Sequence, residues 1–302
     1  MNRSGALLLL LLLAIAAGPL LVSDFWIFVI IQMMVYALYA VAFNLLLGYG
    51  GMLPFGFATF FGLGAYALAI LQVKMGTGIL FAALAAPFVA AAFGGLIAYF
   101  CIRLSGIYFG MLTFAFQMLA YSIFLKSYNF AGGDSGLHGI VIPGALGRPD
   151  GLYYLTLCVV GIGIALLWRI VRSPFGLALR SQSNNPRKSL AIGINVALHR
   201  WLAFTIAAFF AGLGGALSVF ANQSVFPDWL DWRASAAPIV MTILGGMHSF
   251  AGPIIGAAIY VLLQTVMTGV TQYWALFMGA LIIAIVVLMP NGVVNLFGRR
   301  DA

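Results

Sequence analysis

The chain is a succession of long apolar stretches separated by short polar breaks. Apolar segments run at about 6–22, 25–47, 53–72, 79–101, 106–125, 152–168 and 201–221. Most of them approach or exceed the roughly 20 apolar residues that an α-helix needs to cross a bilayer. Segment 6–22 is also compatible with a secretory signal, but its apolar run resumes at Leu20–Val22, which indicates a retained first span. The pattern predicts an all-α, polytopic bundle of transmembrane helices.

The last part of the pattern, residues 235–290, is harder to divide. Its apolar character is interrupted at Gly245–Gly246 and again around residues 269–273. Three short, tilted or partly broken crossings fit this region, which gives about ten spans in total. If residues 236–247 form only a re-entrant half-helix, the count is nine.

The composition agrees with this pattern. Hydrophobic residues make up 64% of the 302 residues and charged residues only 7%, whereas a soluble domain carries about 25% charged residues. Too little polar surface is left to cover a soluble globule. The chain, 1–302, is therefore interpreted as a single transmembrane domain in contact with membrane lipid.

The positive charges are unevenly distributed. Six Lys or Arg and no acid fall within residues 169–200, although the whole chain has only 14 Lys and Arg. They lie between apolar runs and lack the aromatic interleaving of a nucleic-acid site, so no nucleic-acid partner is expected. Short loops rich in Lys and Arg stay in the cytoplasm. Residues 169–200 are therefore predicted to form a cytoplasmic loop.

The same rule orients the rest of the chain. With Arg3 in the cytoplasm, six crossings return the chain there at Arg169, and ten crossings also place Arg299–Arg300 inside. Both termini are then predicted to be cytoplasmic. The loops 126–151 and 222–235 are predicted to lie on the opposite face.

A short helix is predicted inside the basic loop. Asn185 followed by Pro186 is a typical helix start, because Asn caps free N–H groups and Pro suits the first helical position. Gly193 suits the left-handed turn that ends a helix. About seven residues, roughly 11 Å of helix, lie between them, with Leu190 and Ile194 on one side. The pattern alone leaves two interpretations, a helix resting on the membrane surface and a contact for a cytoplasmic partner.

Six motifs then occur in order along the chain. They are GYGGMLPFGFATFFGLGAY (48–66), RLSGIYFGMLTFAF (103–116), GGDSGLHGI (132–140), SPFGLALRSQSNNPRKSLAIGINV (173–196), FAGLGGAL (210–217) and ILGGMHSFAGPIIGAAI (243–259). Together they resemble the LivM-type permease subunit of branched-chain amino-acid ABC importers, over about residues 40–295.

The resemblance implies a function and a set of partners. The chain would be an inner-membrane permease subunit that moves branched-chain or other amino acids, or a related small polar solute. Its partners would be a second homologous permease subunit, two ATP-binding cassette ATPase subunits and an external substrate-binding protein. The loop helix would be the coupling helix that docks on an ATPase. The residues expected at that contact are Asn185, Pro186, Arg187, Leu190, Ala191, Gly193 and Ile194.

The chain lacks the machinery to supply its own energy. No GxxxxGK[ST] phosphate loop occurs, so any ATP must be hydrolysed on another chain. Every Asp maps to a loop or to the end of a span, although proton-coupled carriers need an ionisable group near the membrane midplane. A stand-alone secondary transporter or channel is the alternative. Because the three histidines are far apart in the sequence, we expect neither a metal site nor catalytic residues nor a cofactor.

Polar residues within the spans are candidates for a substrate path. Thr113 and Gln117 share one helix face at i and i+4, and Gln32 and Asn44 belong to a looser stripe. The ordinary role of such residues is hydrogen bonding between helices, worth about 0.6 kcal/mol each in membranes. The alternative role, lining a substrate path, is retained for all four.

Two outer segments are candidates for docking an external binding protein. GGDSGLHGI offers Asp134 and Ser135, and PDWLDW offers Asp228, Trp229 and Asp231. Aromatic residues near span ends also form an interfacial belt without further function. The docking interpretation depends mainly on the family resemblance.

Overall fold

The computed structural model describes residues 23–270, Tyr273, 276–277, 279–280, Ile283 and 292–296. The main helices are α3 (Asp24–Asn44), α4 (Ala58–Val73), α5 (Ile79–Cys101), α6 (Ile107–Lys126), α7 (Tyr128–Ala131), α8 (Pro149–Arg172), α9 (Pro174–Asn184), α10 (Pro186–Ala191), α11 (Val196–Asn222), α12 (Trp232–Gly245) and α13 (Gly252–Val270). A π-helical turn, η1 (Leu45–Tyr49), continues α3. Short 3₁₀ turns are η2 (Gly133–Ser135), η3 (Gly144–Gly147), η4 (Pro227–Leu230) and η5 (Val293–Leu296), and two short strands are β1 (Leu137–His138) and β2 (Ser224–Val225).

The predicted all-α polytopic architecture is confirmed. Six described helices are long and apolar enough to cross a membrane: α3 with η1, α5, α6, α8, α11 and α13. The prediction of nine to ten spans stays a prediction, because the segment 6–22 and most of 271–291 lie outside the described residues.

One predicted span is shorter than expected. The apolar segment 53–72 becomes helical only at Ala58, and α4 has 16 residues, or about 24 Å of helix. The preceding residues 51–57 form a loop and turn. Pro54 lies in this loop and disfavours the helical conformation at Leu53, so a helix does not begin at residue 53.

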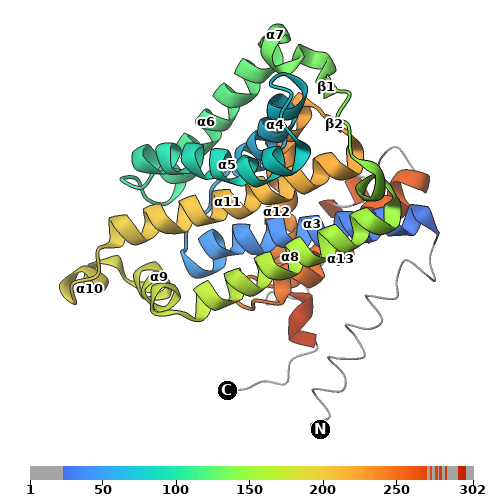
Figure 1. Ribbon diagram of the computed structural model, residues 1–302. Helices are drawn as coiled ribbons and strands as arrows, with labels where there is room; N and C mark the ends of the chain where they lie inside the picture. Colours follow the sequence, from blue (N-terminus) through green and yellow to red (C-terminus); the bar gives the residue numbers. More distant parts are fainter. Residues whose placement is uncertain are drawn as a thin grey trace.

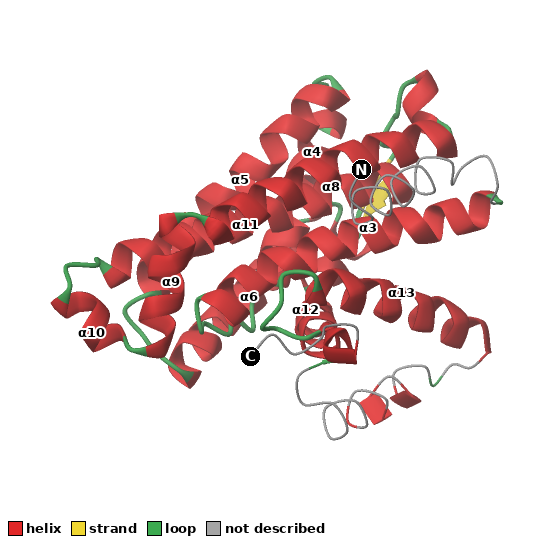
Figure 2. Cartoon of the chain, turned by 90° about the horizontal axis from the view of Figure 1, so that it is seen from below, coloured by secondary structure: helices red, strands yellow, loops and turns green. Residues whose placement is uncertain are grey.

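The bundle has two distinct ends. At one end, β1 pairs antiparallel with β2, Leu137 opposite Val225, which joins the loop 126–151 to the loop 222–235. At the opposite end lie α9 and α10, as both Figure 1 and Figure 2 show. We call these the β end and the basic end. The two loops predicted to share the outer face are thus in contact.

Charge separates between these ends. The basic end carries seven positive residues, Arg103, Arg169, Arg172, Arg180, Arg187, Lys188 and Arg200, and none of the described acids. None of the five described acids lies at the basic end. Asp24, Asp134, Asp150 and Asp228 lie toward the β end with Lys74, Lys126 and Arg148, and Asp231 and Arg233 lie further inside, at the start of α12. A bundle with this asymmetry fits the positive-inside rule with its basic end in the cytoplasm.

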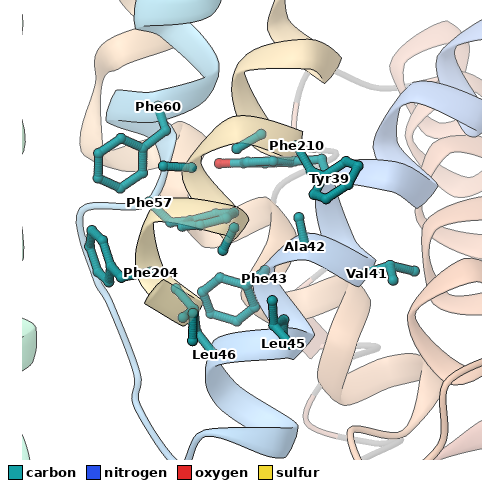
Figure 3. Packing of buried hydrophobic residues seen from close by; sticks show 14 of the residues in the cluster. Tyr39, Val41, Ala42, Phe43, Leu45, Leu46, Phe57, Phe60, Phe204 and Phe210 are labelled. Atoms are coloured by element: carbon teal, nitrogen blue, oxygen red, sulfur yellow. The ribbon is translucent and has the colours of Figure 1, made fainter. Parts of the chain in front are cut away.

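The core is built on close packing of α11 against α4 and α5. A Cβ atom at Gly215 would overlap the carbonyl oxygen of Phe61, and one at Gly64 would overlap the backbone of Gly212. Small residues at these contacts let two backbones approach, which is how helices associate in membranes. The glycines of the FAGLGGAL motif therefore set the spacing of the central helices. Large apolar side chains from α3, α4 and α11 fill the adjacent space (Figure 3).

The helix α12 differs from its neighbours. It has 14 residues, about 21 Å, and it runs steeply across α3 and α11 (Figure 1). It starts beside Gln117, halfway along α6, and the chain after it reaches Asn44 near the basic end, where the Asn44 side chain donates to the Ser249 carbonyl. Residues 223–249 thus pass through the bundle as a broken path. Whether residues 236–247 count as a broken crossing or as a re-entrant half-helix stays a prediction.

Candidate functional site

A cavity of about 630 Å³ lies between α3, α11, η4, α12 and α13. Its walls run from Asn222, at the β end of α11, to Tyr39, well inside α3. Ligand cavities commonly measure about 300–1,000 Å³ and combine apolar walls with a few polar groups. This cavity has both, because Val35 and Phe61 line it together with Gln32.

The polar groups of the cavity include both signs of charge. Asp228 from η4 and Arg233 from the first turn of α12 both line it. Two further lining groups, the hydroxyl of Tyr39 and the Oε1 atom of Gln264, are buried and have no hydrogen-bond partner among the described residues. A buried polar atom without a partner is costly. The cavity therefore offers unsatisfied hydrogen-bonding groups beside two charges.

Aromatic rings close the cavity toward the basic end. Tyr39 stacks on Phe57 with ring centroids 5.3 Å apart, and Phe57 meets Phe43 at 5.3 Å. Phe57 also contacts Phe60, which packs edge-to-face on Phe204 at 5.2 Å. Figure 3 shows these rings filling the space between α3, α4 and α11. The cavity thus ends at an aromatic layer before the basic end.

Of the four residues predicted to line a path, Gln32 lines this cavity. Asn44 is buried on the side of the aromatic layer that faces the basic end. Its Oδ1 atom has no partner among the described residues. The hydroxyl of Thr113 donates to the Gly110 carbonyl of its own helix at 2.7 Å. Thr113 and Gln117 are buried away from the cavity lining. Their surroundings match the ordinary role of hydrogen bonding within the protein, and the predicted role in a substrate path stays a prediction for both.

Gln117 fixes the start of α12. Its Nε2 group donates to the carbonyls of Leu230 at 3.0 Å and Asp231 at 2.9 Å, and its Oε1 atom accepts from the hydroxyl of Ser235 at 3.1 Å. That hydroxyl accepts in turn from the Ala58 backbone N–H at 2.9 Å. One glutamine therefore connects α6, α12 and the start of α4.

The short helix of the basic loop forms as predicted. The side chain of Asn185 accepts a hydrogen bond from the Lys188 backbone at 3.1 Å, which caps α10, and Pro186 is its first residue. Gly193 has φ of +86°, the left-handed conformation expected after the helix. These local signals position α10 at the outermost part of the basic end (Figure 1).

The loop helix presents apolar side chains to its surroundings. Leu190 is 59% exposed and Ile192 72% exposed, and Arg187 and Ala191 are also exposed, whereas Ile194 is half-buried. The hydroxyls of Ser189 in α10 and Ser181 in α9 lie 3.1 Å apart, within hydrogen-bonding distance. The helix is thus anchored on its polar side and leaves an apolar side uncovered in the described chain.

A further contact connects the loop to α3. The guanidinium of Arg180 lies 4.4 Å from the centre of the Tyr49 ring, a cation–π contact. Next to it, Gly51 has φ of +63°, and a Cβ there would overlap the Ser183 hydroxyl. Helix α9 therefore packs directly against the end of the π-helical turn that extends α3. Sequence reasoning did not identify this contact, because Arg180 and Tyr49 are far apart in the chain.

The five residues predicted to dock a binding protein fall into two groups. Asp134 and Ser135 are exposed at the β end in η2, where Ser135 contributes its carbonyl to a 2.7 Å hydrogen bond with His138. Asp228 and Trp229 instead line the cavity, and Asp231 caps α12 by accepting from the Trp232 backbone at 2.6 Å. Sequence reasoning missed Arg233, Tyr39 and Gln264 as cavity residues. The sequence does hold one indication of Arg233, because it is a single positive residue that follows Asp228 and Asp231 in the same outer segment.

The described chain offers no candidate metal site. No group of three or more His, Cys, Asp or Glu side chains within the described ranges lies close enough to hold a metal ion. The groups gathered at the cavity are one carboxylate, one guanidinium, amides and phenols. Groups of these kinds form hydrogen bonds and charge interactions with polar solutes.

The bundle of apolar helices has a partly polar cavity toward one end and an exposed, capped loop helix at the other. This is the architecture of a membrane permease. The chain matches the family described as "Branched-chain amino acid transport system / permease component" over residues 25–286. It belongs to this family.

Individual relatives agree with the family assignment. The chain is 27% identical to the high-affinity branched-chain amino acid transport system permease protein LivM of Salmonella typhimurium, over 95% of this chain and 74% of the relative. LivM of Escherichia coli K12 is 27% identical, over 95% and 73%. The high-affinity branched-chain amino acid transport system permease protein LivH of Escherichia coli K12 is 23% identical, over 86% of this chain and 91% of the relative. No solved structure matches the chain.

Proposed function

We infer that this chain is the membrane-spanning subunit of an ATP-binding cassette importer for branched-chain or other amino acids. The family and its relatives support this reading over a stand-alone transporter or channel. A multi-pass protein of the inner membrane is the corresponding location. The basic end faces the cytoplasm and the cavity lies toward the outer side, because positive charge is retained inside.

One observation carries the proposal. The single helix α3 contributes Gln32, Val35 and Tyr39 to the cavity, and its π-helical extension ends at Tyr49 against Arg180 of α9. A displacement of the basic loop therefore acts on the same helix that lines the cavity. Single π-helical turns are frequent at functional sites of helices. This one lies where α3 meets α9.

The energy input enters through α10. Since the sequence holds no phosphate loop, ATP is hydrolysed on two separate ATPase subunits. Leu190 and Ala191 fill a groove of an ATPase, and Arg187 lies at the rim of that contact. Movement passes from α10 to α9, whose Ser181 faces Ser189, and then to α3.

The remaining partners occupy other surfaces. A second homologous permease completes the membrane part, a role for which the similarity to LivH offers support. A substrate-binding protein docks at the β end, where Asp134 and Ser135 are exposed. Asp228, Trp229 and Asp231 lie beneath that surface, where a delivered solute would arrive.

Reconstitution tests the proposal. The chain, a second permease, the ATPase pair and the binding protein are combined in lipid vesicles, and uptake of radiolabelled L-leucine is followed. We expect uptake that depends on ATP and on every component. Uptake of leucine by this chain alone, driven by an ion gradient, would contradict the proposal and favour the secondary transporter.

A further inference from the structure

We propose that the cavity binds a zwitterion, with Arg233 holding the carboxylate of the solute and Asp228 its ammonium group. This inference deepens the proposed function and rests on it, because it specifies how an amino acid is recognised inside the membrane domain. Both side chains line the same cavity. The family description and the relatives assign no such site.

The two charges are available to a ligand. Within the described residues, neither Asp228 nor Arg233 forms an ion pair, and the guanidinium of Arg233 lies 5.8 Å from the centre of the Trp232 ring. Both side chains are exposed in the single chain. Charged side chains in a membrane domain are costly and face cavities or pathways for a functional reason. A zwitterion would neutralise both at once.

The geometry of α12 favours a carboxylate near Arg233. A helix carries positive partial charge at its N-terminus, and broken helices that begin within the membrane direct this end at anionic groups of a substrate. Helix α12 begins halfway along α6, where Gln117 holds the carbonyls of Leu230 and Asp231. Arg233 is its second residue. Since Asp231 caps Trp232, the guanidinium is the principal group left for the ligand.

The rest of the cavity suits an aliphatic amino acid. Val35 of α3 and Phe61 of α4 contribute apolar wall to the same cavity. The hydroxyl of Tyr39 and the Oε1 atom of Gln264 have no partner within the described part of the chain, so both oxygens can accept a hydrogen bond from an ammonium group or from water around it. A volume of about 630 Å³ leaves room for a solute with several waters.

A second role competes with this one. Asp228 and Arg233 could each meet a charge on the second permease subunit and stabilise the assembly rather than bind solute. Charge-neutral variants of the same shape separate the two roles. Asp228→Asn and Arg233→Gln are the test variants, and Asp150→Asn with Arg148→Gln are matched controls, because both control residues are exposed at the β end and outside the cavity lining.

The first measurement is uptake of L-leucine by the complete reconstituted transporter. A lost charge-assisted hydrogen bond corresponds to about tenfold or more in binding, so each test variant should lower Vmax/KM about tenfold or more, with the second permease and the ATPases retained at wild-type ratio. The controls should transport normally. Normal transport by both test variants overturns the inference, and so does loss of the second permease from either.

The second measurement detects binding without the binding protein. A Ser218→Cys reporter in the cavity wall, in a chain carrying Cys101→Ala and Cys158→Ser, is labelled with a membrane-impermeant thiol reagent in the assembled complex. L-leucine should slow labelling, whereas 4-methylpentanoate and leucinamide, which each lack one charge, should slow it much less. Equal protection by all three contradicts the inference. A wild-type complex that takes up no amino acid would contradict the proposed function itself.

Discussion

The exposed leucine of α10 offers a test of how energy enters this permease. Replacing Leu190 by Asp places a carboxylate where the proposed ATPase contact requires an apolar anchor. The helix itself should survive, because its cap at Asn185 and its contact at Ser189 do not involve the Leu190 side chain. The expected result is loss of the ATPase or loss of coupling between ATP hydrolysis and uptake.

The magnitude follows from exposure. Leu190 is 59% exposed in the single chain, and burying a whole leucine side chain stabilises by about 1.5–3 kcal/mol. Covering the exposed part is therefore worth about 1–2 kcal/mol, or roughly 5- to 30-fold in affinity, which is the loss expected for Leu190→Ala. An unpaired carboxylate buried in the contact adds about 3 kcal/mol or more, so Leu190→Asp should retain almost no ATPase.

The assay is titration of the purified permease pair with the ATPase, followed by ATP turnover and uptake in vesicles. Lys188→Ala is the control on the same helix, because an exposed ion pair is worth about 0–1 kcal/mol and the change should cost less than about fivefold. Wild-type affinity and wild-type coupling in Leu190→Asp would refute the reasoning. In that case α10 rests on the membrane surface and has no part in coupling.

Two further predictions concern the bundle. Gln117→Val removes three hydrogen bonds, and at about 0.6 kcal/mol each the variant should lower the free energy of unfolding by about 2 kcal/mol. Thr113→Val removes two, one donated to the Gly110 carbonyl and one accepted from the Gly56 backbone N–H, and should lower it by about 1 kcal/mol. Full stability of Gln117→Val with lost uptake would instead return this residue to the substrate path. Single cysteines at Asp134 and Arg187 should be labelled from opposite faces of the membrane, the former from outside and the latter from the cytoplasm. Labelling of both from one face would contradict the orientation.

The sequence predicts those features that depend on local chemistry. Runs of apolar residues identify the long helices because a helix in lipid satisfies its own backbone groups. Asn185, Pro186 and Gly193 identify α10 because caps and turn residues act within a few positions. The late start of α4 is the main local error, and it arises because an apolar run does not reveal the loop that precedes Ala58.

The site depends on contacts that the pattern does not contain. Gln117 and Thr113 share a helix face, yet Gln117 bonds residues more than 110 positions away. The Thr113 hydroxyl donates within its own helix and accepts from the Gly56 backbone N–H before α4. In the sequence, Asp228 is an acid of an outer loop. It lines the same cavity as Gln32 because η4 packs into the bundle. Long-range packing, which neither periodicity nor motif spacing encodes, therefore decides which polar residues line the cavity.

The central claim is that the loop helix at the basic end and the cavity toward the β end are connected through α3. The most direct measurement is the accessibility of the Ser218→Cys reporter in the complete transporter, with and without ATP and vanadate, in the chain lacking its native cysteines. We predict a several-fold change in the labelling rate when nucleotide is trapped, and loss of that change when Leu190→Asp is added. A labelling rate that is the same with and without trapped nucleotide would contradict the account.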